Sequence, residues 1–270
     1  MGSLSYTIRI AMLNADTPVP NVYAKTRTYG TIFHNLLSDA ASRISPHTNV
    51  ESTDFDVVRG EYPVSPLDFD AILVTGSAAS AYYDEAWIHT LQAYLTTIYH
   101  SYPHIKIFGS CFGHQIVCQS LLGAFCKVEK NPEGWELGVH GIRLTDDFRK
   151  AFPSAGKTQT SECPNLQLTP APEMMRLQFV HADHVAILEE LPKTWKMVGE
   201  TKRCGVQGVF EPGRVLTFQG HFEFDRFVNS ETIKVFGALW DPVVFQKAMN
   251  AIDADDDALA AAEIVLRFML

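Results

Sequence analysis

Short apolar runs alternate with longer amphipathic segments along the first half of the chain. The apolar runs predict buried strands, whereas apolar positions three and four residues apart predict helices. Because the two kinds of element alternate, they predict a parallel sheet connected by right-handed crossovers. The strands are expected near residues 6–13, 55–58, 69–74 and 105–109, and the helices near residues 29–42, 84–100 and 113–122.

The second half of the chain has strands with fewer helices between them, which predicts an antiparallel extension of the sheet. The expected fold class is therefore α/β, with a mostly parallel sheet flanked by helices. Residues 1–245 are expected to form one domain, with 246–270 as a helical extension packed on it. Three roles are left open for the final helix: it can cover a sheet edge, dock against another subunit or pack on its own domain. The added strands are expected near 124–129, 138–144, 195–200, 206–210 and 214–219.

The composition fits one large core, since 46% of the 270 residues are hydrophobic and 20% are charged. A net charge of -9 argues against a nucleic-acid partner. No apolar run reaches the roughly 18 residues of a membrane span, and the beginning MGSLSY lacks both a signal-peptide core and the myristoylation pattern. Five cysteines without a C-x-x-C pair favour reduced thiols and a cytoplasmic location.

The strongest chemical signal is Cys111, which lies where an apolar strand turns directly into an amphipathic helix. Gly109 and Gly113 flank it two residues away on either side, and such glycines permit a sharp turn that exposes the side chain between them. At the first turn of a helix, free N–H groups and the helix dipole favour a thiolate. The pattern predicts a nucleophile; the alternative is a buried cysteine in a tight turn.

His221 and Glu223 follow a predicted strand and lie two residues apart. Side chains at this spacing project to the same side of an extended segment, so Glu223 can hold one ring nitrogen of His221 while the other faces a thiol. Together with Cys111 they predict a Cys-His-Glu triad. Without a thiol nearby, the same pair is typical of an ordinary surface strand.

A loop of small residues after the strand near 69–74 supplies a candidate oxyanion hole. The N–H groups of Gly76 and Ser77, with the N–H of Phe112 directly after the nucleophile, are donors of the kind that stabilise a developing oxyanion. Taken alone, this loop is equally typical of a simple turn between a strand and a helix.

Two segments resemble metal sites only superficially. The sequence around His181, Asp183 and His184 lacks an accompanying Cys or Glu cluster, so a pocket wall is expected instead of a zinc site. The aspartates within 253–257 lack the glycine and the late glutamate of a calcium loop, and are expected before the final helix. Neither a metal nor a cofactor is expected. A segment rich in Pro, Ser and Thr at 152–172 is expected to be a mobile part of the surface.

The segments GSCFGHQ, TGS and QGHFE together resemble the class I glutamine amidotransferase family, which has a cysteine in G-x-C-x-G-x-Q and a late H-x-E. The resemblance extends from about residue 6 to 240 and is greatest to stand-alone γ-glutamyl peptidases and to relatives similar to the amidotransferase domain of GMP synthetase. It implies a flavodoxin-like fold, with Cys111 as nucleophile, His221 as base and Glu223 as the residue that orients it. The implied substrate-binding residues are Gln115, Val180, His181, Ala182 and Asp183.

Two positions depart from the family pattern, because Phe222 replaces the usual proline of H-P-E and Ser77 replaces the second glycine of the oxyanion loop. The expected function is hydrolysis of a γ-glutamyl amide, in a γ-glutamyl peptide, a glutathione conjugate or glutamine, through a thioester on Cys111. One alternative is a glutaminase subunit that supplies ammonia to a separate synthetase partner, since the chain has no P-loop. Another is a catalytically silent scaffold. Association into a homo-oligomer is left open.

Overall fold

The computed structural model describes residues 6–153 and 172–270, and most of the segment expected to be mobile lies outside these residues. Its centre is a sheet of five parallel strands extended at one edge by two antiparallel strands. The parallel order β2-β1-β3-β4-β12 is that of a flavodoxin-like sheet, which confirms the expected fold class. In sheet order the strands are β2 (Thr48–Asp56), β1 (Tyr6–Asn14), β3 (Ala71–Val74), β4 (Lys106–Ser110), β12 (Val215–Phe218), β11 (Val209–Glu211) and β9 (Lys196–Met197).

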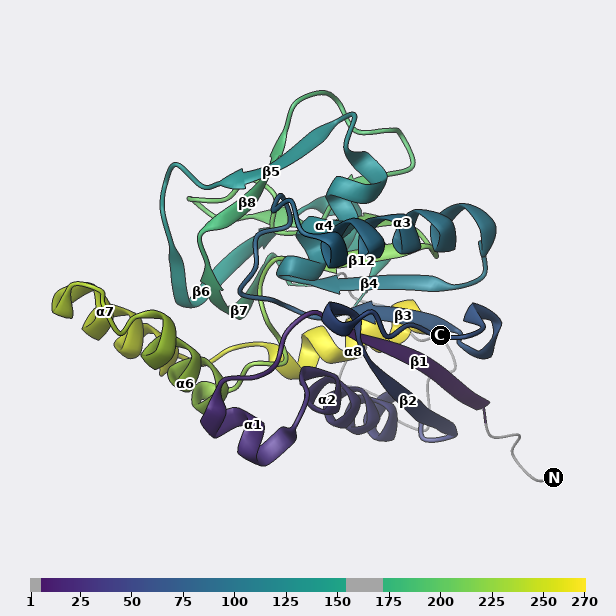
Figure 1. Cartoon of the computed structure of the whole chain (residues 1–270), viewed down its shortest axis with the longest axis horizontal. Coiled ribbons are helices and arrows are strands. Elements are labelled where there is room, and N and C mark those ends of the chain that lie inside the picture. The colour runs from purple at the N-terminus through teal and green to yellow at the C-terminus, as the bar shows by residue number, and fades with distance from the viewer. Residues whose placement is uncertain (1–5, 154–171) are drawn as a thin grey trace, which may run out of the picture.

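Helices cover both faces of the central sheet (Figure 1). Helices α3 and α4 pack on one face, where they meet side chains such as Ile72 and Val74 of β3, whereas α2 and α8 pack on the other face against Leu73 of the same strand. This alternation follows from the pleat of a strand, which directs successive side chains to opposite faces. The helices are α1 (Pro20–Thr26), α2 (Tyr29–Ile44), α3 (Ala86–Ser101), α4 (Phe112–Leu122), α5 (Asp146–Ala151), α6 (Arg226–Phe236), α7 (Pro242–Ile252) and α8 (Ala258–Met269).

Two smaller sheets lie beside the central sheet. One has the order β10-β6-β7 and the other pairs β5 with β8 in an antiparallel arrangement. Gln178 of β7 exchanges main-chain hydrogen bonds of 2.8 and 3.3 Å with His221, so this extension fixes the backbone of the segment that follows β12. The strands are β5 (Cys126–Lys130), β6 (Glu136–Leu144), β7 (Met174–His181), β8 (Asp183–Ile187) and β10 (Gly199–Glu200).

Several predicted elements are misplaced. The strand expected at 55–58 is wrong, since β2 begins at Thr48 and pairs with β1 along its whole length, while Val57–Arg59 forms a 3-10 turn. As an edge strand with mostly polar residues and one buried side chain, β2 lacks the apolar pattern of a buried strand. The strand expected at 195–200 is divided at Val198 into β9 and β10, which belong to different sheets. The sequence pattern did not predict β7, β8, α1, α5, α6 or α7.

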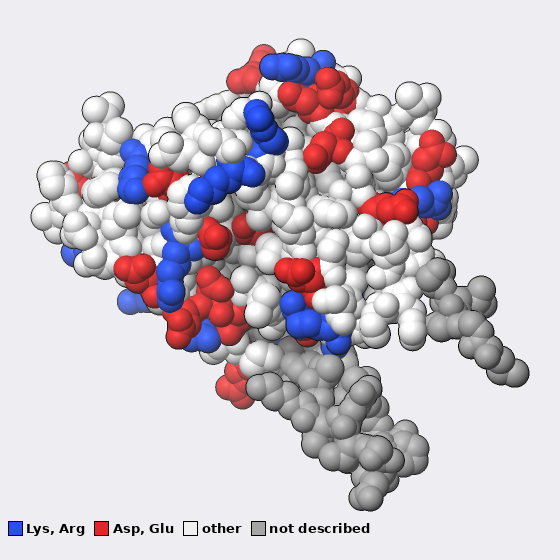
Figure 2. All heavy atoms as spheres, turned by 90° about the horizontal axis from the view of Figure 1, so that it is seen from below, with Lys and Arg blue, Asp and Glu red and all other residues white. Residues whose placement is uncertain are grey.

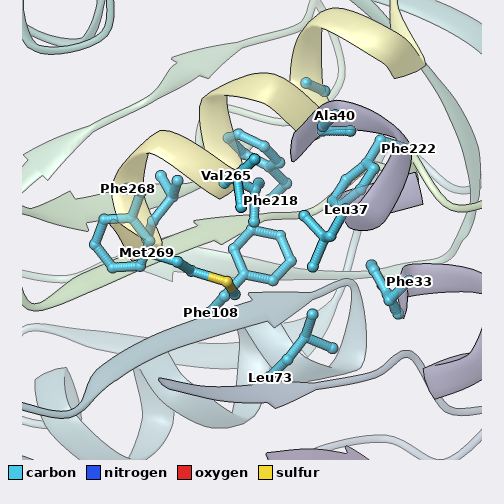
Figure 3. Packing of buried hydrophobic residues seen from close by; sticks show 14 of the residues in the cluster. Phe33, Leu37, Ala40, Leu73, Phe108, Phe218, Phe222, Val265, Phe268 and Met269 are labelled. Carbon is cyan, nitrogen blue, oxygen red and sulfur yellow. The ribbon is translucent and has the colours of Figure 1, made fainter. Parts of the chain in front are cut away.

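The final helix, α8, is part of the main core. Its side chains meet those of α2 and of the central strands, as Figure 3 shows for Val265, Phe268 and Met269. Leu266 is completely buried, whereas Leu259 on the same helix is 58% exposed. The helix therefore stabilises the sheet through one apolar face.

The face drawn in Figure 2 carries Lys and Arg side chains interspersed with Asp and Glu, without a broad area of one sign. Among the residues that the structure describes, none of the helices combines the length and apolar character needed to cross a bilayer.

We predict that Leu266→Ala lowers the free energy of unfolding by about 2–5 kcal/mol, because the lost side chain leaves a cavity in a closed core. Leu259→Ala, at an exposed position of the same helix, is expected to change it by less than about 0.5 kcal/mol. Urea unfolding followed by circular dichroism measures both values. Equal effects of the two substitutions would show that α8 does not depend on its buried face.

Candidate active site

The turn at Cys111 is a strained connection between β4 and α4. Cys111 has φ 53° and ψ −106°, a conformation that costs a residue with a side chain roughly 1–3 kcal/mol. A Cβ atom on Gly109 would lie 2.4 Å from the main-chain oxygen of Gly113, and one on Gly113 would lie 2.2 Å from that of Val74. Close backbone contacts therefore require both glycines. The N–H of Cys111 donates to the oxygen of Phe218 at 2.8 Å, which ties the turn to β12.

His221 and Glu223 form a buried pair beside this turn. The two side chains are joined by a hydrogen bond of 2.6 Å from Nδ1 of His221 to Oε1 of Glu223, and Ser110 donates to the same oxygen at 3.0 Å. A Cβ on Gly76 would lie 3.1 Å from Cε1 of His221 and 3.7 Å from Cβ of Cys111. The imidazole and the Cys111 side chain therefore both lie next to this glycine. Nε2 of His221 has no hydrogen-bond partner within the described part of the chain, which leaves it available to a reacting group.

The environment of His221 favours its protonated form. Burial by itself lowers the pKa of His221, but the charges of Glu223 and Cys111 and the hydrogen bond to Glu223 raise it to about 10 overall. The ring of Phe224 stacks on the imidazole with centroids 4.0 Å apart, and Tyr29 also stacks with Phe224, at 5.8 Å. At neutral pH this arrangement keeps a proton on an imidazole whose orientation is fixed by packing.

The three residues predicted to form an oxyanion hole, Gly76, Ser77 and Phe112, lie in segments next to Cys111. Phe112 is the first residue of α4, so its N–H lacks an intrahelical acceptor. The loop with Gly76 and Ser77 continues from β3, which lies beside β4 in the sheet. Asp16 accepts from the N–H of Ala78 at 2.8 Å and holds this loop in place. The donor assignment of these groups stays a prediction based on their position.

A cavity of about 400 Å³ opens beside Cys111. All five residues that the resemblance implied for substrate binding line it. The carboxylate of Asp183 is already engaged, because it accepts from Ser80 at 2.5 Å and from Tyr82 at 3.2 Å. Its main-chain oxygen accepts from Gln115 at 3.1 Å. The other lining residues are Ser77, Ala78, Ala79, Ser80, Tyr82, Tyr83, Lys130, Trp135 and Phe236.

Comparison with known proteins identifies the family. Residues 28–234 match the family model described as glutamine amidotransferase class-I. A glutamine amidotransferase-like protein of Schizosaccharomyces pombe is 30% identical over 97% of this chain and 98% of its own length. The chain belongs to the class-I glutamine amidotransferase family. Gamma-glutamyl peptidase 3 of Arabidopsis thaliana is 25% identical over 85% of this chain and 80% of its own. The crystal structure of a Thermotoga maritima glutamine amidotransferase has the same fold, with a TM-score of 0.67 and 15% identity over 97% of this chain and 98% of that one.

The chain departs from the family pattern at Phe222, and packing explains how the change is accommodated. Phe222 is 1% exposed and points into the core, where its ring centroid lies 5.3 Å from that of Phe33 and 5.8 Å from that of Phe108 (Figure 3). His221 and Glu223 project to the opposite side of the chain. The aromatic cluster therefore anchors the segment from behind.

The predicted pocket residue His181 belongs to a buried polar network that the sequence did not reveal. Its Nε2 donates to Glu136 at 3.0 Å, and its Nδ1 lies 2.8 Å from the main-chain oxygen of Asp183. Glu136 also accepts from Thr201 at 2.5 Å and from Gln207 at 2.6 Å. Burial by itself raises the pKa of Glu136, but these hydrogen bonds lower it overall. The network orients the wall of the cavity and leaves no nitrogen of His181 free for a metal.

We predict that Gly113→Ala destabilises the protein by about 1–3 kcal/mol or more, because the new methyl group overlaps the main chain of Val74. Gly205→Ala is the matched control, since a Cβ at Gly205 would meet nothing within 4 Å. Thermal unfolding of the two variants measures the difference. A Gly113→Ala variant as stable as the control would show that the close contact at the elbow is not required.

Proposed function

We propose that this protein is a cysteine hydrolase that cleaves the γ-glutamyl amide bond of peptides and their conjugates. The observation that carries the proposal is that Cys111, which lines a cavity of about 400 Å³, lies beside the hydrogen-bonded pair of His221 and Glu223. The geometry gives a nucleophile, a base held in one tautomer and nearby backbone donors, which together are the requirements for acyl transfer to a thiol.

In the proposed first step, the Cys111 thiolate attacks the γ-carbonyl carbon while N–H groups of Phe112 and of the loop with Gly76 donate to the oxyanion. The protonated His221 gives its Nε2 proton to the amide nitrogen, the C–N bond breaks and the amine leaves. The products of this step are a γ-glutamyl thioester and a neutral imidazole.

In the second step a water molecule attacks the thioester carbon and gives a proton to Nε2 of His221. The C–S bond then breaks, glutamate leaves, and the thiolate and the imidazolium are restored. Glu223 remains ionised throughout and stabilises the imidazolium, as the acid does in other triads of this kind.

Aromatic side chains around the cavity support a peptide as the substrate in preference to glutamine. Tyr82, Tyr83, Trp135 and Phe236 line it and are each between 37% and 45% exposed. Such aromatic surface gives contact area to a large leaving group, whereas the ammonia released from glutamine needs none. Relatives named gamma-glutamyl peptidases in Arabidopsis thaliana agree with this preference.

We predict that the purified protein releases glutamate from glutathione or from a glutathione S-conjugate without a partner protein. Mass spectrometry after separate incubation with glutamine, glutathione and the conjugate measures the release and detects a γ-glutamyl adduct on Cys111. Cys111→Ala is expected to lower the rate by at least about 10⁴-fold, because it removes the nucleophile.

Cys118→Ala is the matched control for this experiment. Cys118 is a buried thiol on α4, the helix that follows Cys111, and burial raises its pKa. It is expected to keep its activity. Hydrolysis of glutamine alone would favour the glutaminase subunit, and no turnover of any of the three compounds would contradict the hydrolase proposal.

We predict that Glu223→Gln lowers kcat/KM by about 10²–10⁴-fold, since the amide cannot stabilise the imidazolium. The raised pKa of His221 also means that the wild-type enzyme keeps its proton donor until the pH rises through about 10. Because the substitution removes a charge that raises this pKa, activity at high pH should be lost at a lower pH. The pH profile of kcat/KM measures both effects.

Glu189→Gln removes the same charge at an exposed position and is expected to leave the profile unchanged. A Glu223→Gln profile with an unaltered limb at high pH would exclude the proposed coupling between the carboxylate and His221.

A further inference from the structure

A chain of two buried amides connects the substrate cavity to the sulfur of Cys111. Gln219 is completely buried, and its Nε2 lies 3.5 Å from Sγ of Cys111. Its Oε1 accepts from Nε2 of Gln115 at 3.0 Å. The same nitrogen of Gln115 donates to the main-chain oxygen of Asp183 at 3.1 Å, at the wall of the cavity.

The direction of this chain is fixed by its first member. A main-chain carbonyl can only accept, so Gln115 must direct its NH₂ group toward Asp183. The second N–H of that group faces Gln219, which must therefore present its oxygen to Gln115 and its NH₂ group to Cys111. Reversal of either amide would bring two donors or two acceptors together inside a buried site, which is costly.

We propose that Gln219 is a catalytic residue that donates an N–H hydrogen bond to the sulfur of Cys111, with Gln115 as the positioning residue that holds it in this orientation. The bond stabilises the free thiolate before attack and, resting here on the proposed function, again when the thiolate leaves the thioester. Hydrogen bonds to an ionised partner are stronger than those between neutral groups, and a buried site strengthens them further.

Gln219 supplies a hydrogen bond to the sulfur that does not depend on a protonation state, whereas His221 does not. His221 transfers its proton during both steps of the proposed reaction, so its charge next to the sulfur changes within each cycle. An amide does not titrate, and its hydrogen bond keeps the sulfur oriented whatever the state of the imidazole. Other titratable groups also line the cavities that contain Cys111. Tyr29 and Asp16 line the small cavity of about 30 Å³ with His221, which is paired with Glu223. The larger cavity is lined by Tyr82, Tyr83, Lys130, His181 and Asp183.

The test measures the rate at which iodoacetamide alkylates Cys111 as a function of pH, which requires no substrate. In Gln219→Met, an apolar side chain of similar size removes the donor, and the midpoint of the rate profile is expected to shift by about one unit to higher pH. Gln219→Glu presents oxygen to the sulfur and is expected to shift the midpoint at least as far. Gln119→Met is the matched control, since Gln119 lies on α4 with Gln115 but donates to the main-chain oxygen of Ala81 and not to Gln219 or Cys111.

A double substitution tests the positioning role. Gln115→Met frees Gln219 to rotate and is expected to shift the midpoint in the same direction, but by less than Gln219→Met. If both act through one hydrogen bond, Gln115→Met combined with Gln219→Met should shift the midpoint no further than Gln219→Met alone. An additive shift would overturn the role of Gln115.

A midpoint unchanged in the folded Gln219 variants, or shifted equally in Gln119→Met, would overturn the role of Gln219. Circular dichroism verifies folding, and Gln219→Glu decides the result if Gln219→Met does not fold. A wild-type protein that hydrolyses no γ-glutamyl compound but shows the expected shift would contradict the proposed function and leave the thiolate assignment intact.

Discussion

The strained backbone at Cys111 is the constraint on which the rest of the site depends. A left-handed φ at a residue with a side chain persists only where surrounding contacts outweigh its cost. Here β4 is hydrogen-bonded to β3 on one side and to β12 on the other, and Gly113 lies directly against the main chain of Val74. The sheet therefore holds the turn at the point where three parallel strands end, and each strand adds one component: the loop with Gly76, the thiol, and the segment with His221.

The site also requires that the charged pair of His221 and Glu223 be stable although both side chains are buried. His221 and Glu223 are 3% and 2% exposed, and burial alone disfavours both charges. Their hydrogen bond, the Ser110 hydroxyl and the nearby sulfur compensate for part of this cost. Aromatic packing then fixes the geometry, with Phe224 stacked on the imidazole and Phe222 inserted on the opposite side. The substitution of Phe for Pro therefore exchanges backbone rigidity for side-chain packing.

The sequence predicted those parts of the site that have local signals. The glycines around Cys111 and the spacing of His221 and Glu223 reflect constraints within a few residues, and the parallel order followed from alternating elements. Contacts between distant segments were not predictable, which is why Glu136, 45 residues before His181, was missed. Gln219 stands within the recognised QGHFE segment, but only the fold brings it to Cys111. The polar edge strand β2 was misplaced because its exposed residues conceal the strand pattern.

The residues that line the cavity form two sets that differ in how freely they can be substituted. One set is held by buried hydrogen bonds and the other is partly exposed. The glutamyl side is built from Gln115, His181 and Asp183, whose buried hydrogen bonds connect β7, β8 and α4, so that a substitution there leaves a polar partner unsatisfied. A second part of the lining presents Trp135 and Phe236, which are partly exposed and can vary with little effect on the core. Under the proposed function, the first side holds the γ-glutamyl group while the second selects the leaving group. Sequence differences between relatives that act on different substrates should therefore concentrate at the partly exposed aromatic positions. Gln115 and Gln219, whose amides connect the cavity to the sulfur, should be unchanged.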